Sequence, residues 1–243
     1  MDATQPRAAV TRRGFLYVSV TTLGSYCAFV LAAASVAFGV TWLLLPAHIW
    51  DVQAALFQAG SQPGWYQLLF GEWALMGLVG LAVVGPATNL LAARGGGWSD
   101  WTAKLAYLGF GLTAIQGIHE LVTVPNLGNL FHGCGTCTAS LADQQTLAKW
   151  LYVSLPLDPM NWLIDGTVAL WILALSAIGF SSAGIPRGVL LVGIASAALY
   201  LAVVLADSIE LPFGPPPDAL FVSAAVLAAV WYAWVGVLLR RES

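Results

Sequence analysis

Six long apolar segments constrain the fold of this chain more than any other feature. Each is long enough, at about twenty residues, to cross the roughly 30 Å hydrocarbon core of a bilayer as a helix. Inside that core every backbone N–H and C=O group must bond within the protein, which favours helices. We therefore predict an all-α fold, a polytopic transmembrane helical bundle that forms a single domain over residues 1–243. The predicted spans lie near residues 15–45, 67–91, 101–124, 161–180, 189–206 and 219–239.

Composition agrees with a membrane class. The chain is 59% hydrophobic and 9% charged, with a mean hydropathy of +0.80. In typical soluble domains about a quarter of the residues are charged. The formal net charge is −3 and the nine Lys and Arg residues are scattered, so the chain lacks the concentrated basic surface that nucleic-acid binding requires. We expect the lipid bilayer as a partner and no nucleic acid.

The basic residues lie almost entirely on one side of the predicted bundle, with Lys149 as the exception. Short cytoplasmic loops carry an excess of Lys and Arg, so this side is expected to be cytoplasmic. Both termini then lie in the cytoplasm of a bacterial inner (plasma) membrane protein, which requires an even number of spans. The cytoplasmic group consists of Arg7, Arg12, Arg13, Arg94, Lys104, Arg187, Arg240 and Arg241.

The N-terminal segment allows a second interpretation. Thr11-Arg12-Arg13-Gly14-Phe15-Leu16 has the form of a twin-arginine export signal, and the stretch through Tyr17 resembles the start of some Rieske iron-sulfur proteins over about ten residues. No small-residue cleavage site follows a short apolar core, and no Cys-His ligand box is recognisable downstream. We interpret the arginines as cytoplasmic anchors of the first span.

The longer connections are predicted on the outer side, at residues 46–66 and 125–160. The first has a spacing of apolar residues that suits a short interfacial helix, and the second contains an amphipathic stretch over 141–153. Irregular segments carry function more often than the elements that they connect. Function is therefore expected at the outer face.

Four acidic residues, Glu72, Glu120, Asp165 and Asp207, are predicted to converge near the outer boundary of the membrane. Few cations are available there, so such carboxyl groups must be paired, hydrated, neutral or bound to a ligand. We consider Glu72, Glu120 and Asp165 catalytic candidates if the protein is an enzyme or a transporter. Asp207 and His119 are candidate ligand-binding residues. The alternative is that these acids only mark helix ends, where the dipole favours them.

Cys134 and Cys137 form a C-x-x-C pair on the long outer loop. In an oxidising compartment the pair is predicted to form a disulfide, while a redox site and a metal site that includes His132 remain alternatives. His48 is a further weak metal candidate. No metal is assigned.

Eleven Trp residues occur, most of them near the predicted membrane boundaries, where aromatic belts are common. Trp73 and the deeper Trp171 are candidates for contact with a hydrophobic small molecule. The sequence identifies no cofactor: only His119 is clearly intramembrane, whereas a haem between two spans usually takes two histidines.

Three functions fit these patterns. We expect a non-catalytic membrane subunit or accessory protein whose outward-facing polar rim docks a membrane protein partner or a lipid-like small molecule. The first alternative is a membrane-embedded enzyme that uses intramembrane carboxyl groups for acid-base chemistry on an apolar, isoprenoid-like substrate. The second alternative is a transporter for a cation or small solute.

Overall fold

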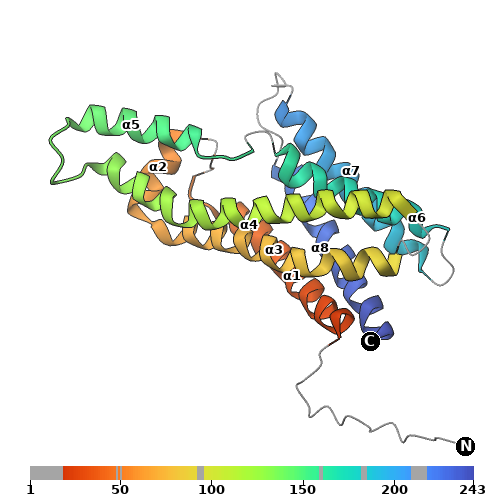
Figure 1. Ribbon diagram of the computed structural model, residues 1–243. Coiled ribbons are helices and arrows are strands. Elements are labelled where there is room, and N and C mark those ends of the chain that lie inside the picture. Colours follow the sequence, from red (N-terminus) through yellow and green to blue (C-terminus); the bar gives the residue numbers. More distant parts are fainter. Residues whose placement is uncertain are drawn as a thin grey trace, which may run out of the picture.

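The computed structural model describes residues 19–47, 49, 51–91, 96–158, 161–181, 185–208 and 218–243, apart from the side chains of Asp207 and Asp218. Every secondary-structure element in these residues is a helix, which confirms the all-α prediction (Figure 1). The elements are α1 (Val20–Leu44), α2 (Val52–Ser61), α3 (Pro63–Leu91), α4 (Gly96–His132), α5 (Leu141–Ser154), the π-helical turn η1 (Trp162–Gly166), α6 (Thr167–Gly179), α7 (Arg187–Ser208) and α8 (Asp218–Glu242).

Within the described residues, five helical segments are long and apolar enough to cross a membrane: α1, α3, the continuous segment Trp162–Gly179, α7 and α8. They are consistent with a membrane protein. The remaining predicted span, 101–124, falls in α4. This helix has 37 residues but is less apolar than the other five, because Gln116, His119 and Glu120 lie along it.

The long helices pack in a closed ring in the order α1, α3, α4, α6, α7, α8 and back to α1. The end of α8 lies beside the start of α1 (Figure 1), where Ser25 Oγ donates to the Gly236 carbonyl at 2.9 Å. The core of the ring is aromatic: Trp171 of α6 packs edge-to-face on Trp231 of α8, with ring centroids 5.7 Å apart. These contacts make one packed body of the six helices.

Helices α3 and α4 approach each other closely because glycines lie at their crossing. A Cβ atom on Gly117 would lie 2.5 Å from the Ala74 nitrogen, and one on Gly77 would lie 2.6 Å from the Ala114 Cα. Only a residue without a side chain fits at such positions. The pair forms the long central hairpin of the molecule (Figure 1).

Helix α4 is longer than the sequence indicated. The predicted span ended at Val124, with irregular chain beyond it, whereas the helix continues through Pro125 to His132. The extension packs on α2 and α5, which lie at the far end of the molecule (Figure 1). Gly128 and Gly60 permit the contact with α2, because a Cβ on Gly60 would lie 2.6 Å from the Gly128 oxygen.

Side-chain caps fix the starts of the two short helices α2 and α5. Asp51 Oδ1 accepts from the Ala54 N–H at 3.0 Å at the start of α2, and Ser140 Oγ accepts from the Asp143 N–H at 3.2 Å at the start of α5. Each cap satisfies an N–H group that has no partner within the helix. The amphipathic stretch predicted over 141–153 corresponds to α5, and the helix expected within 46–66 corresponds to α2.

Candidate functional site

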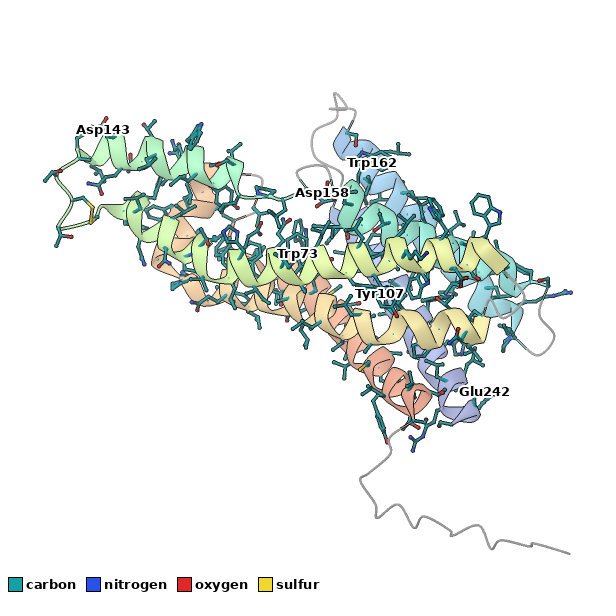
Figure 2. The ribbon with its side chains drawn as sticks, viewed as in Figure 1. Trp73, Tyr107, Asp143, Asp158, Trp162 and Glu242 are labelled. Atoms are coloured by element: carbon teal, nitrogen blue, oxygen red, sulfur yellow. A yellow bond between two sulfur atoms is a disulfide. The ribbon has the colours of Figure 1, made fainter. Side chains whose placement is uncertain are left out.

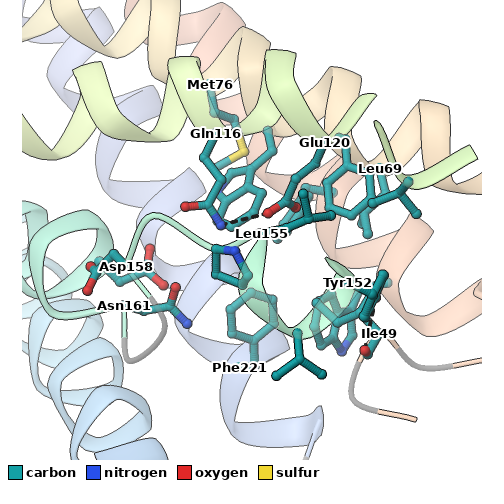
Figure 3. A pocket seen from close by; sticks show the side chains of 18 of the residues that line it. Ile49, Leu69, Met76, Gln116, Glu120, Tyr152, Leu155, Asp158, Asn161 and Phe221 are labelled. Carbon is teal, nitrogen blue, oxygen red and sulfur yellow. Dashed lines mark hydrogen bonds between the residues drawn. The ribbon is translucent and has the colours of Figure 1, made fainter. Parts of the chain in front are cut away.

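A cavity of about 340 Å³ lies among the ring helices, next to α2 and α5 (Figure 3). Side chains from α1, α3, α4, α7 and α8 contribute to its lining, among them Glu120 of α4, and Asp165 comes from η1, the turn before α6. Segments 49–52 and 152–161 supply further lining. The other lining residues are Phe38, Trp42, Ile49, Val52, Leu69, Phe70, Trp73, Met76, Gln116, Val124, Tyr152, Val153, Leu155, Pro156, Asp158, Asn161, Tyr200 and Phe221.

An aromatic cluster from α1, α3 and α8 forms one part of the lining. Phe38 stacks on Trp73 with centroids 6.3 Å apart, and Phe221 contacts Phe38 at 5.8 Å and Trp42 at 4.8 Å. Such offset and edge-to-face pairs add to the stabilisation that burial gives. The cluster therefore holds these rings in place whether or not a ligand is bound.

Glu120 is the most buried acid of the lining, with 5% of its side chain exposed. Its Oε1 accepts a hydrogen bond from Gln116 Nε2 at 2.9 Å (Figure 3). Gln116 Oε1 in turn accepts from the Leu157 N–H at 3.2 Å, which ties α4 to the segment that follows α5. Among the residues that the structure describes, Glu120 has no cation as a partner. The amide of Gln116 thus orients the carboxyl group without neutralising it.

Two tyrosines hold the chain between α1 and α2 against the cavity. Tyr66 Oη donates to the Ala47 carbonyl at 2.8 Å, and Tyr152 Oη donates to the Ile49 carbonyl at 3.0 Å. Burial, followed by the nearby Glu120 and Tyr66, raises the pKa of Tyr152 above its ordinary value. Tyr152 therefore remains a neutral hydrogen-bond donor at physiological pH.

Asp158 lines the cavity, but its carboxylate also organises the chain before α6. Its Oδ2 accepts from the N–H groups of Leu163 and Ile164, the latter at 2.9 Å. Asn161 adopts a left-handed backbone conformation, with φ of 54°, just before the π-helical turn. π-helical turns, and residues other than glycine with a left-handed backbone conformation, occur often at functional sites. Here they position Asp165 on the cavity lining.

The structure brings together some of the residues predicted from sequence and separates others. Glu120, Asp165 and Trp73 line the cavity (Trp73 is labelled in Figure 2). Glu72 is half-buried outside the lining, and its Oε1 accepts from Thr41 Oγ1 at 3.2 Å. His119 is exposed, whereas Glu120, the next residue of the helix, is buried.

Trp171 and Asp207 do not add to the described cavity. Trp171 is fully buried in the core, where its Nε1 donates to Thr88 Oγ1 at 3.0 Å, so packing accounts for its position. The side chain of Asp207 lies outside the described residues.

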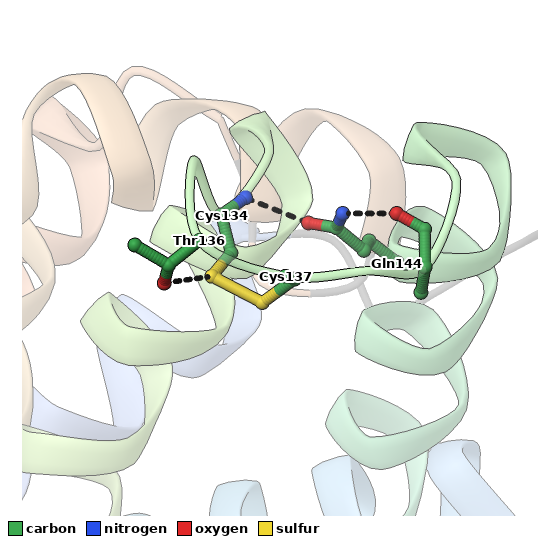
Figure 4. Close-up of a disulfide and its surroundings, with 5 residues drawn as sticks. Cys134, Thr136, Cys137 and Gln144 are labelled. Carbon is green, nitrogen blue, oxygen red and sulfur yellow. Dashed lines mark hydrogen bonds between the residues drawn. A yellow bond between two sulfur atoms is a disulfide. The ribbon is translucent and has the colours of Figure 1, made fainter.

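Cys134 and Cys137 are joined by a disulfide in the loop between α4 and α5 (Figure 4). The loop is further held by Gln144, whose Oε1 accepts from the Cys134 N–H at 2.6 Å and whose Nε2 donates to the Ala139 carbonyl at 2.8 Å. Within the described residues, this bond agrees with the disulfide predicted from the sequence. A metal site requires free thiolates, which a closed disulfide does not offer. A redox site alternates between disulfide and dithiol and therefore stays an alternative.

The metal candidates that the structure describes do not form a metal site. His132 Nε2 lies 2.7 Å from the Phe57 carbonyl, and its ring packs on the Phe57 ring, so it holds α4 to α2. His48 lies outside the described residues. Among those that the structure does describe, no three His, Cys, Asp or Glu residues gather closely enough to hold a metal ion.

Sequence reasoning missed several residues of the cavity. Gln116 precedes Glu120 by four positions, which places both on one helix face, so this pair was detectable. Tyr152 and Phe221 come from distant segments of the chain, and only the tertiary fold brings them to the cavity. The only sequence feature that could have indicated Asp158 is its position as an acidic residue shortly before a predicted span.

Comparison with known proteins leaves the site to be interpreted from its own chemistry. No family model matches the chain, and neither the curated proteins nor the solved structures include a significant match.

Proposed function

We propose that this protein is an integral inner-membrane protein with six spans and cytoplasmic termini, in which α4 is a span although it is less apolar than the other five long helices. The support is its place in the ring: α4 packs extensively on both α3 and α6, which contact each other only slightly. Lys104 lies near the start of α4, on the side where the other basic residues gather. From this polarity we propose that the cavity opens toward the outer face.

We propose further that the cavity is a non-catalytic binding site for a lipid-like small molecule. The observation that carries this proposal is a single cavity lined by an aromatic cluster and by the buried, oriented carboxyl group of Glu120. Ligand sites are mostly apolar, with a few placed polar groups that fix the orientation of the ligand. Phe38, Trp73 and Phe221 supply the apolar surface, and Glu120 with Gln116 supplies the polar end.

Two leucines of one loop allow a matched test. Leu155 lines the cavity, whereas Leu157 is 52% exposed and does not. Leu155→Trp fills the cavity, and Leu157→Trp adds the same bulk outside it. Native mass spectrometry on protein extracted with its surrounding lipid should show a bound small molecule on the wild type and on Leu157→Trp, and its loss on Leu155→Trp. Equal ligand content in all three proteins, or none on the wild type, contradicts a binding cavity.

Acid-base catalysis is the second candidate, because Glu120 and Asp165 line the same cavity. Two carboxyl groups on one apolar cavity are the minimum for an acid and a base. Untargeted mass spectrometry of membrane lipid extract, incubated with the protein in nanodiscs, separates the candidates. Conversion by the wild type that is lost in both Glu120→Gln and Asp165→Asn supports an enzyme. The absence of any converted species supports binding alone.

A further inference from the structure

The charge of the cavity lining is one-sided. It contains three carboxyl side chains, Glu120, Asp158 and Asp165, and no Lys, Arg or His among the residues that the structure describes. Where carboxyl groups of such a lining are ionised, they attract cations and repel anions. Asp158 contributes charge although its Oδ2 is already bonded to two backbone N–H groups.

Glu120 is the most deeply buried of these three carboxyl groups. A carboxylate that is 5% exposed pays a desolvation cost unless an opposite charge or several hydrogen bonds compensate for it. Gln116 provides one hydrogen bond to Oε1, and Oε2 accepts none from the described residues. A cationic ligand in the cavity would supply the missing partner in a low-dielectric site, where such a pair is stronger than in water.

The aromatic cluster favours the same ligand. Phe38, Trp73 and Phe221 line the cavity together with Glu120. The face of an aromatic ring attracts a cation, and the attraction grows when the cation is desolvated. Rings also bury the apolar body of an organic cation, which a hydrated metal ion lacks. The combination of rings and carboxyl groups therefore suits an organic cation better than an inorganic one.

We propose that the ligand of this cavity is an organic cation, an amine or quaternary centre on an apolar body, held between the carboxyl group of Glu120 and the rings of Phe38, Trp73 and Phe221. The inference rests on the proposed binding function and names its ligand class. A neutral hydrogen-bond acceptor, such as a quinone, is the competing class, and the experiment below is designed to separate the two.

Tetraphenylphosphonium and tetraphenylborate are suitable probes because they match in shape and differ in the sign of their charge, and triphenylphosphine oxide is a neutral aromatic acceptor. Saturable binding of each probe is measured by equilibrium dialysis on the full chain in nanodiscs, with empty nanodiscs subtracted to remove partition into lipid. We expect tetraphenylphosphonium to bind at least about tenfold more tightly than either other probe, because it alone pairs with the carboxyl groups.

Glu120→Gln and Glu72→Gln form the matched pair of variants. Glutamine at position 120 keeps an acceptor for the Gln116 amide, whereas Glu72 lies outside the lining. We expect Glu120→Gln to weaken tetraphenylphosphonium binding about tenfold and Glu72→Gln to leave it unchanged. If Glu120→Gln fails to fold, Trp73→Leu tests the aromatic contribution, with an expected loss of about fivefold. Its control is Trp98→Leu, at a residue 72% exposed and outside the lining.

Three negative outcomes distinguish the levels of the proposal. Equal binding of the three probes, or tighter binding of triphenylphosphine oxide, overturns the cationic ligand while the binding cavity stands. Saturable binding of none of the three overturns both the cationic ligand and the binding cavity. Tight binding of tetraphenylphosphonium that Glu120→Gln leaves unchanged overturns the role of Glu120 and with it the proposed ligand class.

Discussion

At the residue scale, two neighbouring residues of α4 lie in different environments. Glu120 is buried on the cavity, and His119, the next residue along the chain, is exposed. Adjacent helix positions differ by about 100° in direction, so proximity in sequence does not make a pair. Glu120 is therefore distinguished by its contact with Gln116 and by its place on the cavity, whereas His119 does not line the cavity.

Asp158 is expected to stabilise the chain at the start of the π-helical turn. Asp158→Ala removes the acceptor of two backbone N–H groups. Losing a cap of this type costs about 1 kcal/mol, which lowers Tm by roughly 2–4 °C for a chain of this size. Thermal unfolding in nanodiscs, followed by tryptophan fluorescence, measures the shift. The exposed Asp100, changed to Ala, is the control, and equal Tm values in the two variants contradict the capping role.

The three cysteines are expected to behave as one thiol and one disulfide. Cys27 is free and half-buried on α1, and Cys134 is bonded to Cys137. Alkylation of the denatured, unreduced protein should add a single label, and alkylation after reduction should add three, as intact-protein mass spectrometry can count. Three labels without reduction would contradict the disulfide and make the metal site the better interpretation.

Helix α4 illustrates what the element scale adds. Its polar residues lower its hydropathy below that of the other long helices, yet its glycines give it the closest packing against α3. Small residues at crossings permit van der Waals contact between helices, which is a main source of association in a membrane. The least apolar of the long helices is therefore held by packing.

Gly117 and Gly111 offer a test of this packing within one helix. A Cβ on Gly117 would meet the backbone of Ala74 and Phe70, whereas a Cβ on Gly111 would meet nothing within 4 Å. Both substitutions to Ala raise helix propensity equally, so the difference reports the crossing. We expect Gly117→Ala to destabilise the protein by about 1–3 kcal/mol relative to Gly111→Ala. Chemical unfolding in mixed micelles compares them, and equal stabilities contradict the close crossing.

The whole molecule shows how far sequence reasoning reaches. Apolar length predicted the helical class and the approximate positions of the long helices, because lipid leaves the backbone few alternatives. The extension of α4 beyond Pro125 was not predicted, since proline usually marks a helix boundary and only contacts with α2 and α5 stabilise the continuation. The cavity was not predicted either. Periodicity assigns a face to Glu120, but it does not say that Phe38 and Phe221 will meet that face.

Topology is the property on which the proposals at this scale depend, and parity tests it. If α4 crosses the membrane with the five more apolar segments, the span count is even and both termini share one side; if α4 does not cross, the termini lie on opposite sides. Green fluorescent protein fused at either end should fluoresce in the cytoplasm, and alkaline phosphatase fused at either end should be inactive. Alkaline phosphatase inserted after Ser140, in the loop that carries the disulfide, should be active. Fluorescence from only one terminal fusion, with a folded chain in both, would contradict six spans and move α4 out of the membrane.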